Sequence, residues 1–135
     1  MSFDKLCDEV MMMSKHVLAA FVEHKEGCRL SERIKKVPIE IEADKILLGL
    51  LRGAQLVELT KDFRKEVGNI QVIIHMFDKL TSFLFPLKDN HTLIVAVEPV
   101  TLEFSSFIKD VKESIRKNRL HMSIIEGQLA CSDPQ

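Results

Sequence analysis

Apolar, β-branched and aromatic residues gather in three short segments between residues 69 and 98. The segments 70–77, 80–85 and 92–98 all have the composition of β-strands. The breaks between them, at 78–79 and 88–90, are too short to hold a crossover helix, so neighbouring strands must run antiparallel. The pattern predicts a three-stranded antiparallel meander in the second half of the chain.

A helix and a β-hairpin are predicted before this meander. Apolar residues recur at helical spacing over 3–14, and Ser2 is a suitable N-cap. The apolar run 16–22 and the alternating segment 28–35 then form two strands around a turn at 23–27. The positions of the second strand that this alternation predicts to face the core are Cys28, Leu30 and Ile34.

A long middle helix is predicted from about residue 43 to residue 67, where Gly68 ends it. Gly49 and Gly53 lie four residues apart within it. They are either tolerated glycines, at a cost of ~1 kcal/mol each relative to alanine, or a flattened face that lets a strand or a helix approach closely. Another amphipathic helix follows Pro99, from about 104 to 117. The predicted core positions of the middle helix are Ile46, Leu47, Leu50, Leu51, Ala54, Val57 and Phe63.

The resulting order, α-β-β-α-β-β-β-α, defines an α+β fold. Segment 93–97 is apolar on both faces, which is typical of a strand covered on both sides at the centre of a sheet. We therefore predict a single five-stranded antiparallel sheet in the order 2-1-5-4-3, with the first and last helices on one face and the middle helix on the other. Residues 1–118 are predicted to form one domain, and 119–135 an extension that is partly ordered at most.

Composition and charge exclude several classes of function. The formal net charge is −1, with no Trp and no Tyr, so a nucleic-acid interface is not expected. No apolar run reaches the ~18 residues of a membrane span, and the first residues do not resemble a secretory signal. The three cysteines lack any motif spacing, which favours free thiols in a reducing compartment. We expect a cytoplasmic protein that does not bind nucleic acid and has no membrane span.

No arrangement of side chains in the sequence predicts an enzyme, a cofactor site or a metal site. His24 and Cys28 lie four residues apart, but the paired ligand spacings of a structural zinc site are missing. Cys7 and Cys28 fall on apolar faces, so we expect both to be small buried hydrophobic residues rather than nucleophiles. A glycine-rich phosphate loop is also missing.

The segments 72–74, 84–87 and 93–99 resemble the roadblock/dynein light chain superfamily, a branch of the profilin-like fold. The start of the chain at 3–7, with residues 90–91 and 98–99, resembles small archaeal proteins related to that superfamily. The resemblance implies the fold predicted above. It also implies a non-catalytic dimeric scaffold or regulator, of a kind that often acts on small GTPases, and it supplies no active-site residues.

A homodimer is predicted from the strand at 70–77, which lies at an edge of the predicted sheet. This strand is apolar on both faces and carries no charge or proline to prevent pairing with another strand, unless His75 is protonated. The middle helix also carries leucines that fall away from its core positions and would be buried by a second copy. The predicted interface residues are Leu48, Leu56, Leu59, Ile70, Val72, Ile73, Ile74 and Phe77.

An alternative function is small-molecule sensing, because profilin-like and PAS-like domains share a sheet-and-helix cradle. Phe83 and Phe85 lie on one face of a predicted strand, and Phe104 and Phe107 on the last helix. These four rings could line a ligand cavity between the sheet and that helix, and core packing explains them equally well.

Overall fold

The computed structural model describes residues 2–35, 52–53, 55–99 and 103–122. Residues 52–53 and 55–59 are helical and lead into the short helices η1 and α3. The elements are α1 (Ser2–Met11), β1 (Val17–His24), β2 (Arg29–Ile34), η1 (Thr60–Phe63), α3 (Arg64–Val67), β3 (Ile73–Met76), β4 (Thr81–Pro86), η2 (Lys88–Asn90), β5 (His91–Val97) and α4 (Phe104–Lys117).

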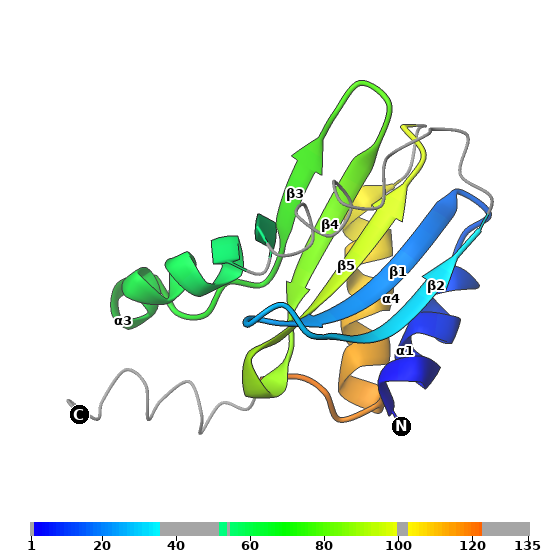
Figure 1. The fold of residues 1–135 in the computed structure, drawn as a ribbon. Helices are drawn as coiled ribbons and strands as arrows, with labels where there is room; N and C mark the ends of the chain where they lie inside the picture. Colours follow the sequence, from blue (N-terminus) through cyan, green and yellow to red (C-terminus); the bar gives the residue numbers. More distant parts are fainter. Residues whose placement is uncertain (1, 36–51, 54, 100–102, 123–135) are drawn as a thin grey trace.

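The five strands form one antiparallel sheet in the order β2-β1-β5-β4-β3, so the predicted fold class and strand order are confirmed (Figure 1). β5 is the central strand and pairs with β1 on one side and β4 on the other. Most of its residues are buried, as the two-faced apolar pattern of 93–97 predicts. β2 and β3 are the two edges of the sheet.

Helices cover both faces of the sheet, in the predicted arrangement. On one face, α1 and α4 both lie against the sheet (Figure 1). Their side chains, such as Leu6 and Val111, belong to one buried cluster with Val95 and Phe83. On the other face, Val57 of the middle helix packs with Phe21, Leu84 and Ile94. Two apolar layers therefore enclose the central strands.

The middle helix is confirmed over its described part, where residues 52–53 and 55–67 are helical throughout. It ends at Gly68, whose φ of 86° is a conformation that favours glycine. The predicted residues Ile46, Leu47, Leu48, Gly49, Leu50, Leu51 and Ala54 lie outside the described residues.

The predicted inward face of β2 is wrong. Leu30, Ile34 and Cys28 are exposed, whereas Ser31 is 6 % exposed and donates a hydrogen bond of 2.5 Å to Asp4 Oδ1. The physical reason is that α1 packs over this strand, and its acidic side chain selects a hydroxyl rather than an apolar group at the buried position. Apolar alternation alone could not identify this partner.

Two other boundaries differ from the prediction. The first helix ends at Met11, and β3 spans 73–76 rather than 70–77. β3 pairs with β4 only as far as the Ile73–Leu84 register, although β4 continues to Pro86. Among the described strands, the sheet edge is therefore incomplete beside Phe85 and Pro86.

α4 has the predicted boundaries. Its N-cap residue Glu103 accepts a hydrogen bond from the Ser105 N–H at 3.1 Å. After the helix, Arg119 adopts a φ of 58° and reverses the chain, and Leu120 is buried. In the described part of the chain, no helix has the length and apolarity to cross a membrane.

Candidate protein interaction surface

The described part of the middle helix has both buried and exposed apolar residues. Gly53 and Val57 are buried against the sheet. Large apolar side chains are also exposed to solvent, three or four residues apart, along helical residues 55–59, η1 and α3. We call these residues the helix stripe: Leu56, Leu59, Phe63 and Val67.

The helix stripe lies on a part of the chain that extends beyond the β3 edge of the sheet (Figure 1). Leu59 is 63 %, Phe63 65 % and Val67 80 % exposed. Single exposed apolar residues are common on protein surfaces, but a stripe of four along one helix is typical of an interaction site. Phe63, which the sequence pattern assigned to the core, therefore belongs to the surface.

β3 is an edge strand with no partner on its outer side among the described strands. It contains no lysine, aspartate, glutamate or proline, which are the residues that usually protect such an edge. Met76 and Phe77 at its end are both largely exposed, and we call them the strand tip. An open backbone edge and exposed apolar side chains thus occur on the same strand.

The predicted interface residues are distributed over both features. Leu56, Leu59 and Phe77 are exposed. Ile70 and Ile73 are partly buried against the Val57 layer. Val72 and Ile74 are partly buried against the α1 and α4 layer. Phe63, Val67 and Met76 were missed, because the sequence alone does not show where the middle helix leaves the sheet.

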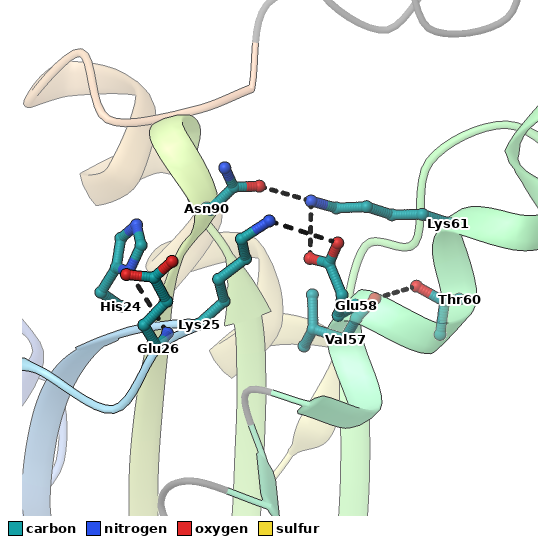
Figure 2. Close-up of polar contacts among 8 residues, drawn as sticks. All are labelled: His24, Lys25, Glu26, Val57, Glu58, Thr60, Lys61 and Asn90. Atoms are coloured by element: carbon teal, nitrogen blue, oxygen red, sulfur yellow. Dashed lines mark hydrogen bonds and ion pairs between the residues drawn. The ribbon is translucent and has the colours of Figure 1, made fainter.

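Polar contacts hold the middle helix to the ends of the central strands (Figure 2). Glu58 lies 2.9 Å from Lys61 Nζ and 3.7 Å from Lys25 Nζ, and the hydrogen bond from Lys61 lowers the pKa of this carboxyl. Lys61 Nζ also donates to Asn90 Oδ1 at 2.6 Å. These partly exposed pairs are individually weak, but together they fix the position from which the helix stripe extends.

The backbone reinforces this junction. The Lys25 N–H donates to the Asn90 carbonyl at 3.0 Å, which joins the β1–β2 turn to the turn before β5. Asn90 has a φ of 62°, a left-handed conformation that asparagine tolerates well. The helix therefore contacts two turns of the chain, the β1–β2 turn and the turn before β5, which are themselves joined.

The remaining candidates for chemistry do not form a common site. His24 Nδ1 accepts a hydrogen bond from the Glu26 N–H at 3.3 Å, and Cys28 is exposed. Cys7 is buried, and burial raises the pKa of its thiol, so it is a poor nucleophile. Across the described ranges, no group of three or more potential metal ligands occurs.

Glu23 is a buried acid that the sequence pattern placed in a turn. It lies on β1, fully buried, with its Oε2 3.6 Å from Arg29 Nε. Burial raises the pKa of this carboxyl. The guanidinium of Arg29 lies over the ring of Phe21 at 5.4 Å, so the acid, the cation and the ring form one structural group on β1 and β2.

The four phenylalanines of the sensing hypothesis pack on one another. The ring centroid of Phe83 lies 5.2 Å from that of Phe104 and 5.1 Å from that of Phe107, and Phe85 stacks on Phe83 at 6.3 Å. These are ordinary distances for aromatic pairs in a core. Phe83, Phe104 and Phe107 therefore pack as core residues between the sheet and α4.

Solved structures share this architecture. The Roadblock/LC7 domain from Streptomyces avermitilis matches with a TM-score of 0.67 at 13 % identity, over 86 % of this chain and 93 % of that chain. The chain has the Roadblock/LC7 fold. MglB from Myxococcus xanthus matches with a TM-score of 0.64 at 15 % identity, over 86 % of both chains. A structure of MglB with a tetrameric arrangement matches with a TM-score of 0.60 at 11 % identity, over 93 % of this chain and 85 % of that chain.

No protein-family profile matches the sequence, and no curated protein matches it either. The likeness to Roadblock/LC7 domains is therefore carried by the structure. The resemblance of segments 72–74, 84–87 and 93–99 is confirmed at the level of the fold, because they contain parts of β3, β4 and β5.

Proposed function

We propose that this chain is a non-catalytic scaffold or regulator of Roadblock type that works as a homodimer. The observation that carries the proposal is the open, uncharged edge of β3 next to an exposed apolar stripe on the middle helix. Such a combination is costly in a monomer, because free backbone groups and apolar side chains both favour pairing with another chain.

A two-fold axis beside β3 would bury both features at once. Antiparallel pairing of β3 with its copy places the end of one strand beside the beginning of the other. The strand tip of one copy then lies near the segment that joins the helix stripe to β3 in the second copy. Pairing would continue the five-stranded sheet from one copy into the next.

A small GTPase is the class of protein partner that the resemblance to the superfamily implies. A surface formed by two copies suits a regulator, since a dimer offers a partner more contact area than either chain alone. The tetrameric arrangement described for MglB supports self-association in proteins of this fold.

The oligomeric state of a helix-stripe variant tests the dimer. Leu59→Glu introduces a charge at a side chain that is 63 % exposed in the monomer, so the fold should be retained with a change in stability within about 0.5 kcal/mol. In the dimer the same charge would be buried without a partner. We expect light scattering to show a dimer for the original chain and a monomer for the variant.

Met12→Glu is the matched control, because Met12 is 85 % exposed and follows α1, away from β3. It should leave the dimer intact. Circular dichroism should show the same secondary structure in all three proteins. A monomeric original chain at high concentration, or a Leu59→Glu variant that stays dimeric, would contradict the proposal.

A further inference from the structure

A groove opens where the β3–β4 ladder stops. Past the Ile73–Leu84 register, Phe85 and Pro86 remain paired with β5 but have no strand on their other side within the described residues. Residues 69–71 pass beside them and α4 forms the opposite wall. The space enclosed is about 580 Å³, which is within the size range of binding sites in proteins.

The groove has an apolar floor and a basic rim. Phe85, Ile108 and Ile115 supply apolar surface. Lys109, Lys112 and Arg116 of α4 supply the charge. Among the described lining residues Glu113 is the one carboxylate, and it pairs with Arg116. A segment with apolar side chains and negative charge would complement this surface.

The chain itself leads into the groove after α4. The Leu120 N–H donates to the Ile115 carbonyl at 3.0 Å, and the Lys88 N–H donates to the Leu120 carbonyl at 2.8 Å. Leu120 is also buried, so the reversal after α4 is held in place. His121 and Met122 then line the groove. Met122, the last described residue, therefore lies at the groove wall.

We propose that residues 123–131 bind in this groove of their own chain. Their apolar residues Ile124, Ile125 and Leu129 match the floor, and Glu126 matches the rim. An extended chain covers about 3.3 Å per residue, so five residues span the roughly 16 Å of α4 between Ser105 and Arg116. Residues 123–131 are long enough to fill the groove without displacing α4.

This proposal does not rest on the dimer, because the groove lies between α4, residues 69–71 and β4, and none of its lining residues belongs to the helix stripe or the strand tip. Its consequence is that the basic face of α4 is covered by the chain itself. An external acidic partner would have to displace residues 123–131 first.

A nitroxide spin label on Cys131 tests the contact in the full chain. Cys28→Ser removes the exposed thiol, and buried Cys7 is protected from the label. We expect the backbone amide signals of Ser105, Lys109 and Lys112 to lose most of their NMR intensity through paramagnetic broadening. The signals of Leu30 and Ile34 in β2, at the opposite edge of the sheet, should keep theirs.

Variants separate a specific contact from chance proximity. Ile125→Asp changes only the segment 123–131 and should restore the α4 signals. Lys109→Glu combined with Lys112→Glu changes only the groove and should restore them too. Lys65→Glu on α3 reverses a charge outside the groove and should leave the broadening unchanged. Full α4 intensity in the labelled original chain would overturn the proposal. So would broadening that appears when labelled chains are mixed with isotope-enriched unlabelled chains, because a second copy would then supply the segment.

Discussion

Gly53 determines how closely the middle helix approaches the sheet. A Cβ atom at this position would lie 2.9 Å from Leu84 Cδ2 and 3.6 Å from Ile94 Cδ1. Both contacts are with side chains of the buried layer around Val57. Of the two interpretations that the sequence left open for this glycine, these distances favour close approach to a strand. Gly49 lies outside the described residues.

Gly53→Val should destabilise the protein by about 1–3 kcal/mol, because a branched side chain has to displace Leu84 from its packing. Gly53→Ala is the smaller change. Its single methyl meets only the end of the Leu84 side chain, and the gain of about 1 kcal/mol in helix propensity offsets the strain. Urea unfolding of both variants checks the ranking, and equal stability of the valine variant and the original chain would show that the helix can move away.

At single positions, the sequence predicted packing well where a side chain is apolar and its neighbours are too. Val57 and Cys7 are buried as expected. The errors have two causes. Ser31 is buried because it bonds to Asp4 on α1. Phe63 is exposed because this part of the middle helix extends beyond the edge of the sheet. Asp4 is distant from Ser31 in the sequence, and the sheet edge is formed by residues distant from Phe63. A local sequence pattern could therefore identify neither.

α1 and α4 are joined by one carboxylate. Glu9 accepts hydrogen bonds from Ser114 Oγ at 2.9 Å and Asn118 Nδ2 at 2.6 Å, and lies 2.7 Å from Lys117 Nζ. The contact with Lys117 and these hydrogen bonds lower the pKa of Glu9 from 4.5 to about 2. The charged form of Glu9 is therefore the form that the folded state stabilises.

Glu9→Gln should cost about 1–2 kcal/mol of stability at neutral pH, through weakened contacts between α1 and α4. Because the folded pKa is depressed, the contribution is complete above pH 4.5 and decreases as the pH falls towards about 2. Urea unfolding at several pH values should show the difference between variant and original chain shrinking over this range. Glu113→Gln, on the exposed Arg116 pair, is the control, and a pH-independent difference for Glu9→Gln would contradict the assignment.

Among the elements, the sequence predicted order, pairing and approximate ends. α4 has the expected boundaries because its apolar periodicity stops where its capping residues begin. β3 is shorter than its apolar run, since the run continues into residues that line a groove instead of pairing with β4. When a strand ends because pairing with its neighbour ends, the amino-acid composition of the segment does not show where.

For the whole molecule, the proposed dimer makes stability depend on protein concentration. Folding is then coupled to association, so the melting temperature of the original chain should rise by several degrees over about a hundredfold increase in concentration. Leu59→Glu should melt at the same temperature throughout that range. Differential scanning calorimetry provides the measurement, and a constant melting temperature for the original chain would argue for a monomer.

The two edges of the sheet differ in chemistry. β2 presents Arg29, Glu32 and Arg33 along its length, and they are engaged in ion pairs with one another and with α1. β3 contains no lysine, arginine, aspartate or glutamate. A sheet whose two edge strands could both pair with other copies could polymerise without limit, by adding copies at both edges. If only one edge strand can pair, a symmetric contact between two copies uses that strand in both. Assembly then ends with the dimer. If the proposed dimer forms through β3, the charges of β2 would therefore oppose the addition of further copies at the other edge of the sheet.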